Sequence, residues 1–133
     1  KFDIEKFVDV NGKTGIYLQY AQVRAGKILN QYQTQNNKEV LDNLNEDERK
    51  LVFEITKLPY YFFKSLEKNE PHHIAEYAYS LCQIFNSFYS NNKIFSSSIT
   101  ETVMNQRLFI VKSFYTTIHT VFELLGMSPV NEM

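Results

Sequence analysis

Apolar residues recur at helical spacing along most of the sequence, and polar or proline-containing stretches separate the periodic segments. The first periodic segment predicts a helix over residues 14–33, and the polar stretch 35–37 is expected to end it. Residues 39–44 are expected to form a short helical piece. The predicted core face of the first helix carries five residues at helical spacing: Leu18, Ala21, Ala25, Ile28 and Tyr32.

A helix start is predicted at Asn45, because Glu48 follows three residues later in the spacing of a capping box. This helix is expected to end at Pro59, and residues 60–68 are expected to form another short helix. The helix that starts after Asn45 is predicted to bury three aliphatic side chains: Leu51, Ile55 and Leu58.

Two long helices are predicted in the second half of the chain. The first starts at Glu70 and Pro71, since proline is tolerated at the first helical position. It has an apolar stripe made of Ile74, Tyr77, Ala78, Leu81, Phe85 and Phe88. The second follows residues 98–101 and ends at Gly126, a suitable C-terminal cap.

The last of these helices is expected to be the central one, since its apolar residues cover most of its circumference: Leu108, Val111, Phe114, Tyr115, Ile118, Phe122 and Leu125. No segment with the period of a strand competes with these helices. The pattern therefore predicts an all-α fold, a bundle of about four to six helices.

Composition limits the function classes that need to be considered. The 133 residues are enough for one domain, with 1–12 expected as a connector and 13–133 as the helical domain. Lys1 in place of an initiator Met suggests a piece of a longer chain. One cysteine excludes an internal disulfide and suits a reducing compartment, so a cytoplasmic location is expected. No signal peptide or charge-free apolar run of about 20 residues is found, and no membrane contact is expected.

The first predicted helix has a second face beside its core stripe, formed by Tyr17, Tyr20, Arg24 and Lys27. Two aromatic rings and two cations aligned in this way suit RNA, because unpaired bases stack on rings while cations meet phosphates. The alternative interpretation is a tyrosine-rich edge of the core with two solvated cations. A net charge of −1 argues against a broad polyanion-binding surface, so DNA is not expected as a partner.

Two further side chains allow more than one interpretation. Arg107 lies within the apolar stripe of the last helix, where an unpaired guanidinium would be too costly. It is expected to pair internally, to extend out to solvent near the helix start, or to meet a phosphate or a base. Tyr89 lies at the edge of its stripe, where it either packs in the core or reaches a rim.

Signatures of catalysis and of metal binding are absent from the sequence. There is no glycine-rich phosphate loop, nucleophile elbow or nucleotide-binding motif of the HxGH or KMSK kind. His72 and His73 are adjacent and Cys82 lies on an apolar helix face, so no metal-ligand spacing is found. We expect no catalytic residue, metal or cofactor within these residues.

Five segments, in the same order, resemble the C-terminal anticodon-binding domain of arginyl-tRNA synthetases, the helical type named for its DALR motif. Residues 15–24, GIYLQYAQVR, resemble the family signature Gly-Pro-Tyr-Leu-Gln-Tyr-Ala-x-x-Arg. Residues 71–77 resemble Pro-His-x-hydrophobic-Ala-x-Tyr, and 85–89 match Phe-Asn-x-Phe-Tyr. Residues 107–108 match an Arg-Leu pair, and 124–133 resemble the Leu-Leu-Gly ending that closes on Met.

The sequence also departs from the family pattern. Ile16 stands in place of the usual proline and Gln22 in place of a frequent histidine. No literal DALR tetrapeptide is present, the tail reads Val-Asn-Glu-Met, and residues 96–102 lengthen one loop. These departures leave the fold expectation in place and bear on how closely the family's contacts are shared.

The resemblance implies an anticodon-binding domain whose parent enzyme attaches arginine to its tRNA with ATP and Mg²⁺ at a separate catalytic domain. The expected partners are arginine tRNA, through its anticodon loop, and the parent's own catalytic domain. The fragment itself would not be an enzyme. The expected tRNA-binding residues are Tyr17, Tyr20, Arg24, Lys27, Tyr89, Arg107 and Met133.

Two alternatives belong to other classes. A helical protein-interaction module without RNA contact would suit the tyrosine-rich face equally well. The related anticodon domain of a cysteine enzyme is disfavoured by the Tyr-Leu-Gln-Tyr-Ala spelling of residues 17–21.

Overall fold

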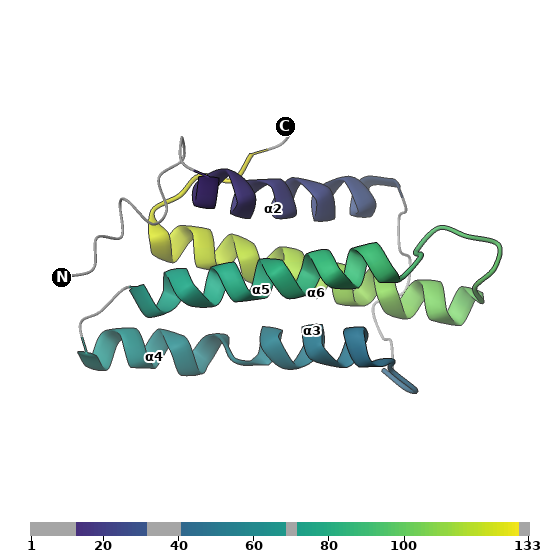
Figure 1. Ribbon diagram of the computed structural model, residues 1–133, viewed down its shortest axis with the longest axis horizontal. Helices are drawn as coiled ribbons and strands as arrows, with labels where there is room; N and C mark the ends of the chain where they lie inside the picture. The colour runs from purple at the N-terminus through teal and green to yellow at the C-terminus, as the bar shows by residue number, and fades with distance from the viewer. Residues whose placement is uncertain (1–12, 32–40, 69–71, 131–133) are drawn as a thin grey trace.

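The computed structural model describes residues 13–31, 41–68 and 72–130. These ranges hold five helices and no strand: α2 (Lys13–Gln31), α3 (Glu46–Thr56), α4 (Leu58–Lys68), α5 (His72–Asn91) and α6 (Glu101–Leu125) (Figure 1). The predicted all-α bundle is confirmed, and so are the two long helices of the second half.

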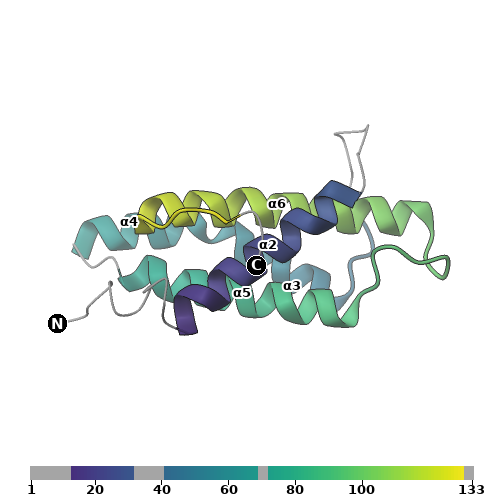
Figure 2. The ribbon, with the colours of Figure 1, turned by 90° about the horizontal axis from the view of Figure 1, so that it is seen from above.

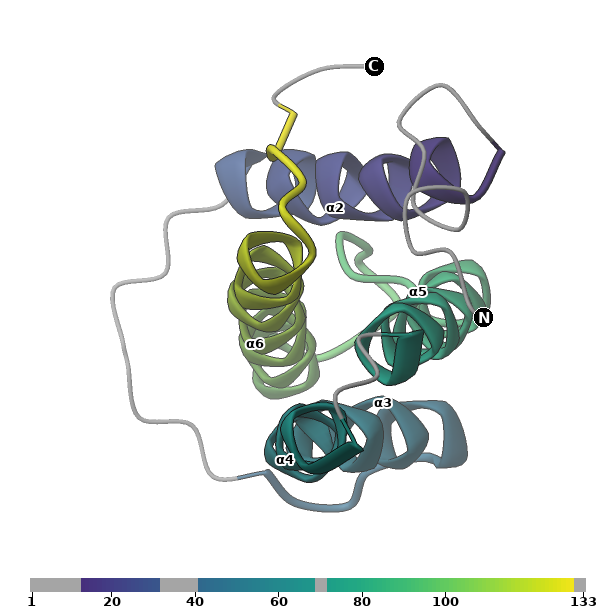
Figure 3. The same ribbon diagram turned by 90° about the vertical axis from the view of Figure 1, so that its left-hand side faces the viewer.

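The helices are arranged in three layers. The middle layer is an antiparallel pair, α5 and α6, and α3 and α4 follow one another along one side of it (Figure 1). On the opposite side α2 crosses both middle helices diagonally (Figure 2). The view along the bundle shows α2 and the α3–α4 layer separated by the middle pair (Figure 3). The two outer layers therefore present separate surfaces.

Aromatic side chains dominate the core between these layers. Phe85 of α5 and Phe114 of α6 are wholly buried and stack with their ring centroids 4.0 Å apart, at 5° between the ring planes. The predicted stripe of α5 is buried along its whole length, from Ile74 to Phe88. The predicted core face of α2 is buried at its four described positions: Leu18, Ala21, Ala25 and Ile28.

Helix α6 is the most apolar of the long helices, and six of its side chains are wholly buried: Leu108, Val111, Phe114, Ile118, Val121 and Phe122. By length and composition alone it would also suit a membrane span. In this bundle it packs against α2, α3 and α5, which is the position of a core helix.

The two predicted caps, the capping box at Asn45 and Gly126, are confirmed, and Thr100 is a further cap that was not predicted. The Asn45 side chain accepts from the Glu48 N–H (2.8 Å), and the Glu48 carboxylate accepts from the Asn45 N–H (2.8 Å), which completes the capping box. Thr100 caps the start of α6, where its Oγ1 accepts from the Val103 N–H. At the other end Gly126 adopts the left-handed conformation with φ of 72°.

Two predictions about local structure are wrong. Residues 41–44 are not helical, because Asn43 has a φ of 52° and the Asp42 N–H donates to the Gln106 side chain, not to a helical carbonyl. Pro59 does not end a helix. It lies in the first turn of α4, where a missing N–H costs nothing, and α3 ends earlier, with Lys57 as its C-cap.

Several expectations lie outside the described residues. They are the connector 1–12, Tyr32 with the end of the first helix at 33, the break at 35–37, the start of the short piece at 39–40, the helix start at Glu70 and Pro71, and the final Met133.

Candidate functional site

A groove of about 600 Å³ lies between α2, the end of α5 and the loop that follows α5. Three cations and three aromatic rings line it: Tyr20, Arg24, Lys27, Tyr89, Lys93 and Phe95. No Asp or Glu of the described residues is part of this lining. In a chain with a net charge of −1, the groove is therefore a local concentration of positive charge.

Arg24 is the centre of the groove's geometry. Its guanidinium carbon lies 5.0 Å from the ring centroid of Tyr20 and 4.5 Å from that of Tyr89, both within cation–π range. Its Nη1 donates to Asn86 Oδ1 at 3.0 Å. One helix thus supplies the cation and one ring, and α5 supplies the other ring and the amide that orients the guanidinium.

The two rings are well placed for a planar ligand. Tyr20 is 50% exposed and Tyr89 is 40% exposed, although both contact the guanidinium. Tyr89 also packs on Phe85 of the core, which limits the freedom of its ring. Tyr89 was predicted either to pack in the core or to reach a rim, and in the structure it lies at the rim of the groove.

Tyr17 lies apart from this groove. It packs on Tyr79 with ring centroids 5.2 Å apart, is partly buried against the core, and borders a separate shallow depression with Asn86 and Ser90. Burial raises the pKa of Tyr17, and a hydrogen bond with Asn86 acts in the opposite direction. Because Asn86 contacts both Tyr17 and Arg24, the tyrosine is linked to the groove through one amide.

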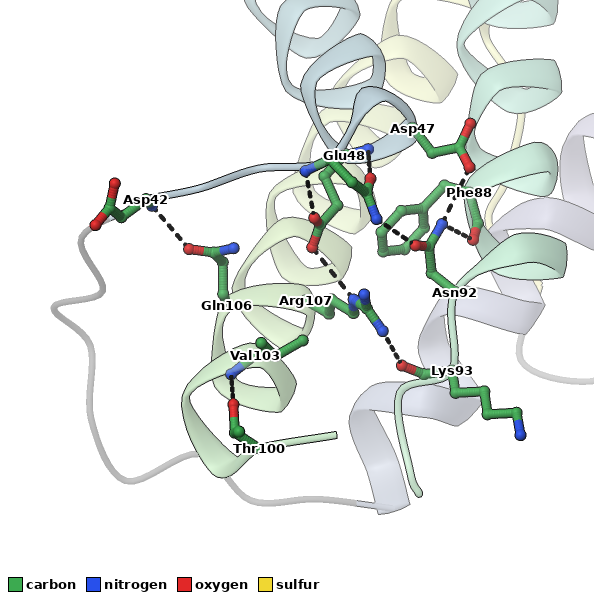
Figure 4. Close-up of polar contacts among 11 residues, drawn as sticks. Asp42, Asp47, Glu48, Phe88, Asn92, Lys93, Thr100, Val103, Gln106 and Arg107 are labelled. Carbon is green, nitrogen blue, oxygen red and sulfur yellow. Dashed lines mark hydrogen bonds and ion pairs between the residues drawn. The ribbon is translucent and has the colours of Figure 1, made fainter. Parts of the chain in front are cut away.

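Arg107 pairs internally, one of its three expected outcomes. Its Nε lies 3.2 Å from Glu48 Oε2, and its Nη1 donates to the Lys93 backbone carbonyl at 2.6 Å (Figure 4). The side chains of Arg107 and Glu48 are only 13% and 3% exposed. The guanidinium therefore contacts the backbone that carries Lys93 and does not itself line the groove.

The residues that were not predicted include Asn86, which contacts Arg24 but does not line the groove, and the groove residues Lys93 and Phe95. Helical spacing gives no signal in the loop that follows α5, so the last two could not be found by periodicity. A compositional signal does exist, because Lys93 is the only cation in the polar stretch 90–100, and it directly precedes two of the three large apolar residues there, Ile94 and Phe95.

The described residues offer no evident metal site, since no group of three or more His, Cys, Asp or Glu side chains is placed to hold an ion. Burial raises the pKa of the Cys82 thiol, which lies wholly in the core. The predicted position of Met133 at the site is untested, because that residue lies outside the described part of the chain.

The fold and the groove define a class: an all-helical domain with a cationic, aromatic-lined groove. The sequence matches the DALR anticodon binding domain over residues 18–133. The chain belongs to this family.

Individual relatives are consistent with that assignment. The chain is 35% identical over 140 residues to an arginine–tRNA ligase of Francisella tularensis subsp. novicida, which covers 99% of this chain and 24% of the relative. It is 31% identical to the arginine–tRNA ligase of Latilactobacillus sakei, over 99% of this chain and 23% of the relative. The chain therefore spans about a quarter of the length of these curated relatives.

Solved structures agree with the sequence comparison. The arginyl-tRNA synthetase of Thermus thermophilus superposes with a TM-score of 0.82 at 26% identity, over 93% of this chain and 22% of that one. The arginyl-tRNA synthetase of Plasmodium falciparum gives a TM-score of 0.78 at 29% identity, over 100% of this chain and 24% of that one. The predicted resemblance and fold type are confirmed.

Proposed function

We propose that this chain is the anticodon-loop-binding domain of an arginine–tRNA ligase, and that the groove holds unpaired nucleotides of the tRNA. The observation that carries the proposal is the Arg24 guanidinium in contact with two exposed tyrosine rings, in a groove with two lysines and no carboxylate among its described lining residues. Family membership and the names of the relatives support it.

The groove suits single-stranded RNA in three ways. The exposed faces of Tyr20 and Tyr89 offer stacking surfaces to splayed bases. Arg24 has five N–H donors, of which the Asn86 bond uses one, so others are available to a phosphate or a base edge. Lys27 of α2 and Lys93 of the loop after α5 are exposed at the groove and can meet the backbone phosphates.

In this proposal the domain acts by positioning. It holds and spreads the anticodon loop and contributes to the choice of tRNA, and the attachment of arginine with ATP and Mg²⁺ takes place on a catalytic domain elsewhere in the parent enzyme. Tyr17 supports the groove through Asn86. Met133 remains a predicted contact, and the cytoplasm is the proposed location.

The test compares two matched tyrosine–cation pairs, each four residues apart on a helix. Tyr20 and Arg24 line the groove, whereas Tyr60 and Lys64 form a similar pair on α4 in the opposite outer layer, with Lys64 Nζ 5.7 Å from the ring centroid. Each residue is replaced by alanine in the longer protein that the proposal requires. The affinity for arginine tRNA is then measured over several salt concentrations, after circular dichroism has confirmed folding.

Tyr20→Ala is expected to weaken binding by ~1–3 kcal/mol, the usual cost of removing a stacked ring. Arg24→Ala is expected to weaken binding and to lower the salt slope by about 0.7, the value for one phosphate contact on a single strand. Tyr60→Ala and Lys64→Ala should bind as the wild type does. Wild-type affinity in folded Tyr20→Ala and Arg24→Ala proteins would instead favour the protein-interaction alternative.

A further inference from the structure

An ion pair with little exposure and a hydrogen bond to a backbone carbonyl join three elements next to the groove. Arg107 of α6 contacts Glu48 of α3 through Nε and donates through Nη1 to the carbonyl of Lys93, in the loop after α5 (Figure 4). The 2.6 Å bond to Lys93 is charge-assisted, which makes it stronger than an ordinary backbone bond. Arg107 thus holds the backbone of Lys93, while the side chain of Lys93 is exposed at the groove.

The same network holds the preceding residue. Glu48 accepts from the Asn45 N–H as part of the capping box, and the Asn45 side chain donates to Asn92 Oδ1 at 2.7 Å. Asn92 is 6% exposed, and its Nδ2 donates to the Phe88 carbonyl at 2.8 Å (Figure 4). Two consecutive loop residues are therefore held by the start of α3 and by α6.

We infer that the Glu48–Arg107 pair positions the groove wall, and that Arg107 acts on RNA binding through the loop of residues 92–95 without touching RNA itself. The inference rests on the proposed function of the groove. It follows from the direction of the contacts, since both fixed residues belong to the segment that presents Lys93 and Phe95 to the groove. Arg107 is thus a positioning residue.

Charge and shape can be separated by two conservative variants. Arg107→Lys keeps the positive charge and loses the planar fork that reaches Glu48 and Lys93 together. Glu48→Gln keeps the side-chain shape and an acceptor for the Asn45 cap while it removes the negative charge. If Arg107 contacted a phosphate, Arg107→Lys would largely keep that contact and Glu48→Gln would strengthen RNA binding. If the pair positions the loop, both variants weaken RNA binding.

We expect each variant to weaken tRNA binding by about 3- to 30-fold, and the double variant to weaken it no more than the worse single variant, because both break one unit. The decisive measurement repeats Arg107→Lys in a Lys93→Ala background. If Arg107 acts through the loop, much of its effect should vanish once the lysine is gone. An unchanged effect in that background would overturn the inference.

A matched control separates positioning from loss of stability. Gln106 is also buried on α6, and its Oε1 accepts from the Asp42 N–H at 2.8 Å, on a segment that does not line the groove. Gln106→Leu should lower the melting temperature and leave tRNA affinity unchanged. If it weakens binding as much as Arg107→Lys at equal stability loss, the positioning role is rejected.

Tyr20→Ala and Arg24→Ala distinguish failure of this inference from failure of the proposed function. If those two variants lose affinity while Arg107→Lys and Glu48→Gln bind normally, the groove is the RNA site and the ion pair does not position it. If all four bind normally, the groove is not the RNA site and both ideas fail.

Discussion

At the scale of single residues, Arg24 shows how one side chain organises a surface. Its guanidinium contacts Tyr20 from its own helix and Tyr89 from another, and Asn86 fixes its orientation. The sequence predicted that Tyr20 and Arg24 lie together, because residues four apart share a helix face. The Asn86 contact could not be predicted, since it depends on how α2 crosses α5.

Tyr17 and Lys93 mark the limits of the residue-level prediction. Tyr17 belongs to the predicted helix face, yet its ring packs on Tyr79 of α5 and borders a depression that is separate from the groove. Lys93 lies in a loop, where no periodicity exists to assign it to a face. Spacing within one helix was enough to predict which residues share a face. Contacts between different elements could not be predicted from it.

Cys82 gives a prediction at this scale. Its thiol is wholly buried on α5, and burial raises its pKa above the ordinary value of 9.0. The thiolate is the reactive form, so iodoacetamide at pH 8 should label the folded chain far more slowly than the urea-unfolded chain. Mass spectrometry of the alkylated protein measures the two rates. Equal rates would mean that this part of the core opens freely.

At the scale of elements, the helix ends were predicted where side chains determine them locally. The Asn45–Glu48 capping box and the Gly126 cap need only a few consecutive residues, and both were found. Pro59 and residues 41–44 were misjudged for a different reason. A proline can follow the end of one helix or lie in the first turn of the next, so Pro59 alone does not fix the boundary. The backbone of residues 41–44 depends on a hydrogen bond from the Asp42 N–H to Gln106, which is distant in the sequence.

Gly126 allows a clean test of backbone conformation. A Cβ added there would meet no atom within 4 Å, so Gly126→Ala introduces left-handed strain without a clash. We expect a loss of about 1–2 kcal/mol in the free energy of unfolding, the cost of this conformation for a residue with a Cβ. Gly126→Asn should lose less, because asparagine tolerates the left-handed region. Equal stability of all three proteins in urea would mean that the cap does not limit α6.

At the scale of the whole molecule, the fold followed from the sequence more directly than the site did. Apolar stripes predicted α5 and α6, and the apolar residues around most of the circumference of α6 predicted its enclosed position. The groove depends on three elements that meet at one end of the bundle, α2, α5 and the loop after it. No single segment carries that information.

Phe114 tests the enclosed position of α6. Its ring is wholly buried and stacks on Phe85, so Phe114→Ala removes a ring from between two helices. We expect a loss of ~3–5 kcal/mol, measured by denaturant unfolding. Phe63, which is 64% exposed on α4, is the matched control, and Phe63→Ala should change stability by less than about 1 kcal/mol. A loss of that small size at Phe114 would contradict the central placement of α6.

The uneven distribution of charge has a kinetic consequence. The sequence carries 15 Asp and Glu against 14 Lys and Arg, yet the described lining of the groove gathers three cations and no carboxylate. An approaching polyanion is therefore attracted to the groove more strongly than to the chain as a whole, which carries a net charge of only −1. Such steering raises the association rate and fades as salt rises, while the rate of departure changes little. Under the proposed function, the three groove cations would therefore speed the arrival of RNA at the groove as well as hold it there.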